Sequence, residues 1–403
     1  MKAAATVTSS GNRTETPGMR GATLPGHATS TPTARPSSSA TALLAPDTWQ
    51  TDINRQYRQS HHRRLLTLGA SLVLLLILML LDLTTGPSGM PVADVMQALQ
   101  LGPMDPASAA TAHERKIGII LWQLRMPQTA MGLLVGACLG LAGLQMQTIL
   151  DNPLASPFTL GFSAAAGFGA ALAIMFGGAL PLPDHVLVPA AAFGMTLVAC
   201  GLVHLLAMLR NASADILILG GIAVLFFFQS MQSLLQFLAS PEVLQQIVFW
   251  LFGSLLKSSW TSVATTALIL LLCLPLIIRD SWALTTLRLG DANAMSLGLS
   301  VARIRRRTFI LVALLTAAAV AFVGTIGFVG LIAPHAARTL VGEDHRFALP
   351  LSAMAGAIIL VGASVCAKLI SPAAVIPVGI ITAVAGVPML FAIIVQRSRG
   401  GNH

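Results

Sequence analysis

The sequence predicts an all-α integral membrane protein with about ten transmembrane helices. The chain of 403 residues is 55% hydrophobic and only 10% charged, whereas soluble domains carry about 25% charged residues because their surfaces face water. Its mean hydropathy is +0.78. Glycine is abundant, at 35 residues, as expected where helices pack closely in lipid. These observations exclude a single water-soluble globule.

The formal net charge of +9 indicates membrane topology rather than a nucleic-acid partner. The lysines are few, and the arginines stand at the ends of apolar runs. Basic residues that flank membrane helices account for this distribution. We therefore expect membrane lipid, and no nucleic acid, as a partner.

The composition changes near residue 60. Residues 1–60 are rich in Ser, Thr, Pro and Ala and contain no apolar run long enough to pack, so this cytoplasmic extension is predicted to be disordered. It also lacks the apolar core and cleavage site of a secretory signal peptide. Residues 61–403 are predicted to form one transmembrane domain.

Apolar segments of about 20 residues, the length that crosses a bilayer, follow one another along this domain. They are 65–83, 126–150, 158–180, 186–209, 216–238, 260–278, 308–323, 347–368 and 377–395. The uncharged stretch from Phe309 to Pro334 predicts either one long helix or two shorter helices broken at Gly324, Gly327 and Gly330. With ten spans, most arginines fall on the side of the N-terminus, so the positive-inside rule favours ten spans with both ends in the cytoplasm.

Residues for catalysis or ion coupling are missing from the predicted spans. Every acidic residue after Leu65 falls in a loop or at a helix end, which argues against a proton or sodium relay. There is no HExxH zinc signature, no metal-ligand spacing among the cysteines and no Gly-Lys-Ser or Gly-Lys-Thr phosphate loop. We expect no enzyme activity and no metal or cofactor bound by this chain, so any ATP must be hydrolysed by another chain.

One glycine pattern has two interpretations. Gly132, Gly136 and Gly140 recur every four residues, and Gly143 continues the row. A flat stripe of this kind serves either close helix packing or the lining of a pore.

The segment 279–307 is predicted to be a long basic loop outside the bilayer that contains a docking element. Asp291 can cap a short helix from Ala292, and Gly298 can end this helix in a left-handed turn. An apolar stripe runs along it, formed by Leu289, Ala292, Met295 and Leu299. Such a surface predicts docking of a soluble protein, and an interfacial helix lying on anionic lipid is the alternative.

Four segments carry more specific motifs. They are "LRMPQTAMGLLVGACLGLAGLQMQTILDNPLASPFTLGFSAAAGFGAALAI", "LGDANAMSLGLSVARIRRR", "GFVGLIAPHAARTLVGEDHRFALPLSAMAGA" and "IPVGIITAVAGVPML". Together they resemble the FecCD family of permeases, the membrane subunits of type II ATP-binding-cassette importers for ferric siderophores, haem and cobalamin. The resemblance covers residues 62–399. It implies ten helices with inverted repeats and a homodimer or heterodimer of permeases with the path at the subunit interface.

The resemblance also implies roles for particular residues. Coupling to an ATPase dimer, which would hold ATP and Mg²⁺, falls to Gly290, Asp291, Ala292, Met295, Leu297 and Gly298. The cytoplasmic gate maps to Asn211 and Ser213 in "RNASADILILGG". Docking of a periplasmic substrate-binding protein falls to Arg125 and Lys368, with Gln128 where a second arginine is common.

The sequence therefore predicts the permease subunit of an ATP-driven importer in the bacterial inner membrane. Ferric siderophore is the expected cargo, and haem and cobalamin are the alternatives. An ion-coupled secondary transporter and a membrane-embedded enzyme or scaffold are the rival interpretations.

Overall fold

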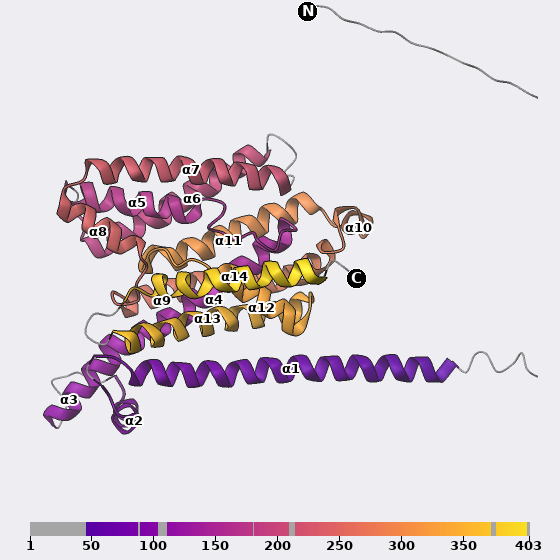
Figure 1. Ribbon diagram of the computed structural model, residues 1–403, viewed down its shortest axis with the longest axis horizontal. Helices are drawn as coiled ribbons and strands as arrows, with labels where there is room; N and C mark the ends of the chain where they lie inside the picture. Colours follow the sequence, from indigo (N-terminus) through magenta and orange to yellow (C-terminus); the bar gives the residue numbers. More distant parts are fainter. Residues whose placement is uncertain are drawn as a thin grey trace, which may run out of the picture. The chain divides into compact units, whose positions relative to one another are not determined.

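The computed structural model describes residues 46–87, 89–103, 111–179, 181–208, 214–371 and 376–400. The chain divides into two compact units, residues 1–56 and 57–403, and the packing of the helices lies in the second unit. Figure 1 labels the α-helices. The elements are α1 (Pro46–Thr84), α2 (Val92–Leu101), α3 (Ala112–Gly118), η2 (Ile119–Arg125), α4 (Met126–Ile149), α5 (Phe162–Phe176), η3 (Gly177–Ala179), α6 (Asp184–Met208), α7 (Ala214–Leu238), α8 (Pro241–Leu251), α9 (Trp260–Leu287), α10 (Asp291–Ser296), α11 (Val301–Val323), α12 (Val329–Val341), α13 (His345–Ile370) and α14 (Val378–Gly400).

Within the described ranges, 8 helices are long and apolar enough to cross a membrane. They are α1, the continuous run of α3, η2 and α4, the run of α5 and η3, and α6, α7, α9, α11 and α13. Two shorter segments join them, the 13-residue helix α12 and the apolar Val378–Ala392 part of α14. Together, the eight long helices and the two shorter segments correspond to the predicted spans. The predicted class, an all-α membrane protein, is confirmed.

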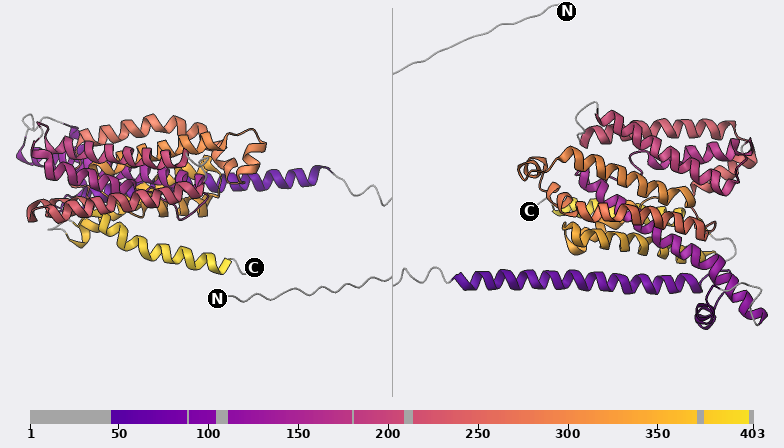
Figure 2. Two further views of the ribbon diagram at one scale, coloured as in Figure 1. Left: turned by 90° about the horizontal axis from the view of Figure 1, so that it is seen from above. Right: turned by 180° about the vertical axis from the view of Figure 1, so that it is seen from behind.

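The centre of the bundle is formed by α4 and α11, which pack against each other. Helices α9, α12 and α13 also pack on α4. Helices α5 to α8 pack among themselves, and α5 and α6 also pack on α11. Figure 1 shows α5 to α8 as one layer above α4, α9 and α11 to α13. Figure 2 shows α14 on the outside of the bundle.

Helix α4 approaches α13 backbone to backbone along its glycine row. A Cβ added at Gly136 would lie 2.5 Å from the carbonyl oxygen of Gly356, and one added at Gly140 would collide with the carbonyl oxygen of Ser352. The Ser352 hydroxyl donates to the Gly140 carbonyl over 2.8 Å. Close helix packing is therefore the correct interpretation of these glycines, because neighbouring backbone covers them.

The uncharged stretch after Phe309 forms two helices rather than one. Helix α11 ends at Val323, and Gly324 adopts a φ of +77°, a left-handed conformation that favours glycine. A Cβ on Gly324 would also collide with the carbonyl oxygen of Trp250. The Ser254 amide donates to the Val323 carbonyl over 2.7 Å. The segment after α8 thus holds the break between α11 and α12.

The predicted disorder of residues 1–60 is wrong over residues 46–60, which belong to α1. Once a helix has formed, each further residue adds a hydrogen bond at small cost, so the helix of the first span extends into its polar flank. Residues 1–45 lie outside the described part of the chain, and disorder there stays a prediction. In the span itself Leu66 and Leu76 are 59% and 57% exposed, as expected of a helix that faces lipid.

A π-helical segment, η2, joins α3 to α4. In its hydrogen-bond pattern the Met126 amide donates to the Leu121 carbonyl, and the amide of residue 127 would donate to the Trp122 carbonyl. Residue 127 is a proline and has no N–H to donate. The Trp122 carbonyl instead accepts from the indole Nε1 of Trp260, over 2.8 Å. This bond holds the start of α9 against η2.

Candidate docking and coupling site

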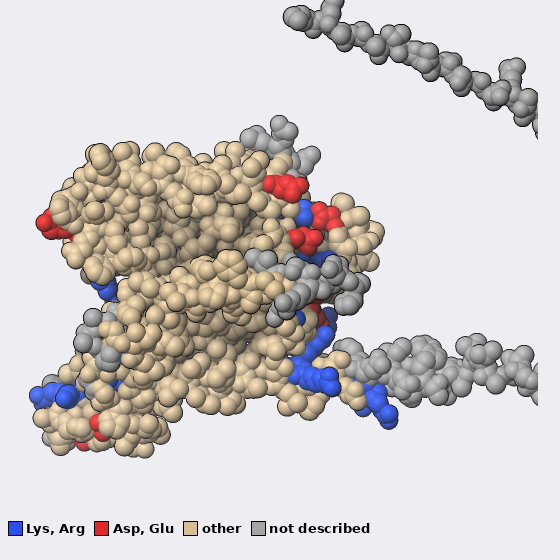
Figure 3. All heavy atoms as spheres, in the orientation of Figure 1, with Lys and Arg blue, Asp and Glu red and all other residues tan. Residues whose placement is uncertain are grey.

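Charged side chains gather mainly at two ends of the bundle. In Figure 3 the blue and red atoms lie toward the two ends of the view, and a broad uncharged surface separates them. Helix α10 lies at one end and α2 and α3 lie at the other (Figure 1). We call them the α10 end and the α2–α3 end. An uncharged belt between two charged ends is what a membrane-embedded bundle requires.

The connection between α9 and α11 is shorter than predicted. Helix α9 continues to Leu287 and α11 begins at Val301, so the prediction of a long loop over 279–307 is wrong at both ends. Leu and Arg are good helix formers, which lets both helices extend past their apolar parts. Asp280, predicted to end a span, therefore lies inside α9, where it is buried and pairs with Arg307.

Asp291 begins α10 but does not cap it. Its carboxylate pairs with the guanidinium of Arg305, whose Nη2 lies 3.0 Å from Oδ1 and whose Nη1 lies 2.9 Å from Oδ2. The prediction that Asp291 is the N-cap is wrong: Gly290 occupies the N-cap position, and no side chain accepts a hydrogen bond from the first amides of α10. The predicted left-handed turn at Gly298 is confirmed by its φ of +80°.

The apolar stripe of α10 is largely exposed. Leu289, Met295 and Leu297 are 65%, 58% and 58% exposed. Ala294 is fully buried and anchors α10 to the bundle, whereas Leu299, predicted to be part of the stripe, is half-buried against the core. An anchored helix that exposes large apolar side chains at a charged end is suited to bind another protein.

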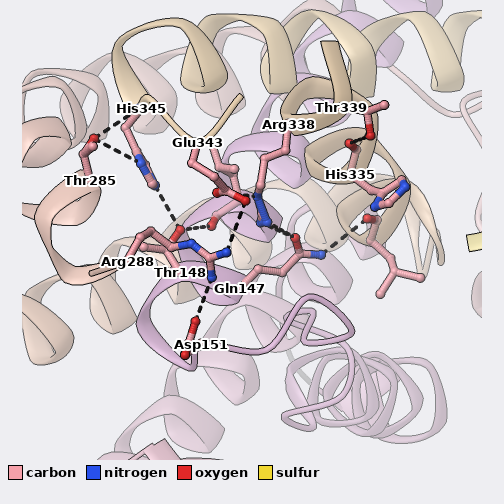
Figure 4. A network of polar contacts seen from close by, with 12 residues as sticks. Gln147, Thr148, Asp151, Thr285, Arg288, His335, Arg338, Thr339, Glu343 and His345 are labelled. Carbon is pink, nitrogen blue, oxygen red and sulfur yellow. Dashed lines mark hydrogen bonds and ion pairs between the residues drawn. The ribbon is translucent and has the colours of Figure 1, made fainter. Parts of the chain in front are cut away.

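Arg288, which follows α9, links three segments of the α10 end (Figure 4). Its Nη1 lies 2.8 Å from Asp151 Oδ1 in the turn after α4, and its Nη2 lies 3.2 Å from Glu343 Oε1 between α12 and α13. The Arg288 side chain is 22% exposed, against 75% for Asp151 and 50% for Glu343. One guanidinium with two charge-assisted bonds therefore joins α9, α4 and the α12–α13 connection.

Gln147 and Arg338 extend this network into the bundle. Arg338 Nη1 donates to Gln147 Oε1 over 2.9 Å, and Arg338 Nε lies 3.4 Å from Glu343 Oε2. Gln147 is fully buried, and its Nε2 donates to the Leu331 carbonyl over 3.4 Å. Figure 4 shows Arg338 pointing from α12 toward Gln147 on α4. The last turns of α4 and α12 are thereby joined by polar contacts.

His345 joins three helices beside this network. It is 1% exposed at the start of α13. Its Nε2 lies 2.9 Å from Thr148 Oγ1 on α4, and its Nδ1 lies 3.3 Å from Thr285 Oγ1 on α9. The His345 backbone N–H also donates to Thr285 Oγ1 over 3.2 Å. The α10 end is therefore cross-linked by side chains from α4, α9, α12 and α13.

At the α2–α3 end, Arg125 and Lys368 are buried, with 5% and 6% exposure. Lys368 Nζ lies 2.8 Å from Asp82 Oδ1, and Thr129 Oγ1 donates to Asp82 Oδ2 over 2.6 Å. Arg125 donates to the carbonyl of Leu83. These contacts hold the end of α1 against α4 and α13. Neither cation is presented at the surface in this conformation, and their docking role stays a prediction.

Two further observations concern the predicted gate and metal ligands. Asn211 and Ser213 lie outside the described residues, so the gate assignment stays a prediction. The described residues include no group of three or more His, Cys, Asp or Glu side chains that could hold a metal ion.

Sequence reasoning did not identify Arg288, Arg305 and Glu343 as site residues. Each is visible in the sequence only as one charge near a helix end. Their pairing depends on contacts between distant positions, such as Arg288 with Asp151. The usable signal is that acids and bases occur together at helix ends predicted to lie on one side of the membrane.

The fold and this site define a helical membrane protein in which a short, exposed helix between two spans stands at one end of the bundle. The model of the FecCD transport family matches residues 74–396. The chain belongs to the FecCD family.

Known proteins agree with this assignment. The iron-uptake system permease protein FeuC of Bacillus subtilis is 33% identical over 343 residues, which cover 82% of this chain and 97% of FeuC. The vitamin B12 import system permease protein BtuC of Klebsiella pneumoniae is 33% identical over 81% of this chain and 92% of BtuC. A solved inward-facing structure of a metal-chelate type ABC transporter superposes with a TM-score of 0.70 at 32% identity, covering 83% of this chain and 99% of that one.

Proposed function

We propose that this permease carries an iron(III) chelate of the siderophore type across the bacterial inner membrane by alternating access. Two similarities support this cargo, one to an iron-uptake permease and one to a metal-chelate type transporter. Cobalamin, the cargo named for BtuC, is the main alternative, and haem is another. The alternative interpretation, an ion-coupled secondary transporter, has no support from the FecCD assignment.

A pair of ATPase subunits docks on α10 in this proposal and holds the ATP and Mg²⁺, while the permease itself binds no cofactor. The exposed apolar side chains of α10 carry the proposal, because Met295 and Leu297 stand outside the predicted spans on a helix anchored by Ala294. The docking surface comprises Gly290, Ala292, Met295, Leu297 and Gly298. Asp291 shapes α10 through its pair with Arg305 rather than by touching the ATPase.

A periplasmic substrate-binding protein docks at the α2–α3 end in the same proposal. Because Arg125 and Lys368 are buried, the exposed cations Arg115, Lys116 and Lys257 are the groups that would meet acidic side chains first. The α10 end then faces the cytoplasm, as do both termini. A second permease copy completes the assembly, and the path runs between the two copies.

Alternating access needs two states of the bundle that the ATPase selects between. ATP-driven closure of the ATPase pair displaces the two α10 helices, and the permeases respond by opening toward one side or the other. This chain contributes the docking helix and the packed helices that move.

The proposal is tested with Met295→Asp, which places a charge in the apolar stripe, and with Met96→Asp as the matched control. Met96 is 49% exposed on α2, at the opposite end. We expect Met295→Asp to lose the co-purifying ATPase and Met96→Asp to retain it. Equal ATPase recovery with both variants would contradict docking on α10.

The cargo is tested in proteoliposomes that contain the permease, the ATPase and the binding protein. Radiolabelled ferric siderophore and radiolabelled cobalamin are offered separately, with and without ATP. We expect ATP-dependent uptake of the ferric siderophore. Uptake of cobalamin alone would contradict the cargo, and uptake under an ion gradient without ATP would contradict the transport class.

A further inference from the structure

Two arginines on either side of α10 each bind one residue of the segment 149–151 at the end of α4. Arg305 Nε donates to the carbonyl oxygen of Ile149 over 2.9 Å. Arg288 Nη1 donates to Asp151 Oδ1 over 2.8 Å. Arg288 precedes α10 and Arg305 follows it, so the α10 connection is tied to residues 149–151 from both of its flanks.

The Arg305 guanidinium is shared between α10 and α4. Its two Nη atoms hold both oxygens of Asp291, the first residue of α10, and its Nε holds the last residue of α4. The side chain is only 10% exposed. A planar guanidinium fixes its partners in direction as well as distance. Displacement of Asp291 therefore acts on the carbonyl of Ile149 through one rigid group.

The residues that these arginines hold begin the turn that leads from α4 to α5. Asp151 has a φ of +44°, and the Asn152 amide folds back to the Gln147 carbonyl over 3.1 Å. Leu154, two residues further on, is 45% exposed. The turn, residues 150–161 between α4 and α5, is thus internally hydrogen-bonded and open to the outside at Leu154.

We propose that Arg288 and Arg305 are positioning residues that transmit displacement of α10 to the turn between α4 and α5. The inference rests on the proposed function, because it takes α10 as the helix that the ATPase moves. Arg288 also holds Glu343, so the same displacement reaches the connection between α12 and α13. The exposed apolar side chains of α10 bind the ATPase, and the two arginines behind α10 connect it to the bundle.

The test reads the movement of the turn directly. Leu154→Cys is introduced after the native cysteines are replaced, and the permease is reconstituted with its ATPase. The rate of labelling by a membrane-impermeant maleimide is measured without nucleotide and with Mg-ATP and vanadate. We expect ATP to change this rate about fivefold or more, the usual lower range of coupling between two sites.

Four substitutions separate coupling from folding. Arg288→Met and Asp151→Asn should each reduce the ATP-dependent change to less than about twofold. The first removes the guanidinium that bonds to the turn, and the second removes the negative charge that this guanidinium meets there. Asp151 is 75% exposed, and asparagine tolerates a left-handed φ, so Asp151→Asn is expected to fold. Arg306→Met is the matched control, because Arg306 is exposed at the same end. Arg288→Lys should restore part of the response.

Each outcome bears on the proposal. Loss of the response in Arg288→Met and Asp151→Asn, with ATPase still bound and Arg306→Met normal, supports it. A full response in Asp151→Asn and Arg288→Met overturns it, as does a wild-type protein that binds ATPase but shows no response. Failure of the wild-type protein to bind ATPase through α10 would instead count against the proposed function, and the co-purification assay reports this separately.

Discussion

The ammonium group of Lys368 lies 2.8 Å from the carboxylate of Asp82, and the pair is almost completely buried. Asp82 is 0% exposed and comes from the end of α1, whereas Lys368 comes from the end of α13. Two residues 286 positions apart in the sequence thus form an ion pair, and each charge is buried because the other neutralises it. The outermost span, which packs loosely elsewhere, is fixed to the bundle here.

Lys368→Met should destabilise the protein by about 3–5 kcal/mol, because it leaves the Asp82 carboxylate buried without its main partner. The free energy of unfolding is measured in detergent by titration with a denaturing surfactant, followed by tryptophan fluorescence. The matched control is Lys257→Met, since Lys257 is exposed and exposed substitutions usually change stability by less than about 0.5 kcal/mol.

The double variant Asp82→Asn with Lys368→Met should recover much of the lost stability, because no buried charge remains unpaired. A single variant as stable as wild type would show that water reaches the Asp82 carboxylate. The same result would favour Lys368 itself as a docking cation at this end.

Gly136→Ala should destabilise the bundle by about 1–3 kcal/mol, the usual cost of overpacking. The added methyl group would lie 2.5 Å from the carbonyl oxygen of Gly356, and two helix backbones would have to separate. Gly194→Ala in α6 is the control, since its Cβ would meet no atom within 4 Å. Gly194→Ala should be neutral or slightly stabilising because alanine favours helix. Equal effects in thermal unfolding would contradict the close packing of α4 on α13.

The spans could be predicted from the sequence because hydropathy and length decide them locally. Helix α4 ends at Ile149, within one residue of the predicted end of the span, whereas the continuous helical run begins at Ala112 rather than at Met126. The two ends of the 279–307 segment were predicted less well, because there polar residues continue a helix that apolar residues begin. Hydropathy locates the part of a helix that lies in lipid, and the helix itself extends beyond that part.

The short helix α10 could also be predicted, because turn glycines and an apolar stripe are local signals. Gly298 adopts the left-handed φ expected of it. The partners of Asp291 and Lys368 could not be predicted from the sequence, since tertiary packing brings Arg305 and Asp82 to them. A lone charge in a sequence does not reveal whether a cap, an ion pair or a protein partner will neutralise it.

Gly324→Ala should cost more stability than Gly327→Ala, although both glycines lie in the break between α11 and α12. Gly324 has a φ of +77°, and a Cβ there would collide with the Trp250 carbonyl. Gly327 has no atom within 4 Å of its added Cβ. We expect a loss of about 1–3 kcal/mol for Gly324→Ala, from strain and overpacking together, and little change for Gly327→Ala. Surfactant-induced unfolding of the two variants provides the comparison, and equal stabilities would show that the break adjusts freely.

The orientation of the permease predicts opposite labelling of its two ends. Met295→Cys, exposed on α10, should react with a membrane-impermeant maleimide only in inverted membrane vesicles, because the positive-inside rule places the α10 end in the cytoplasm. Lys116→Cys, exposed on α3, should react only in right-side-out vesicles. Native cysteines are replaced first, since Cys366 is exposed. If both positions react from one side, the number of spans between residues 116 and 295 is even rather than odd as predicted. The α10 end and the α2–α3 end could then not serve partners in different compartments.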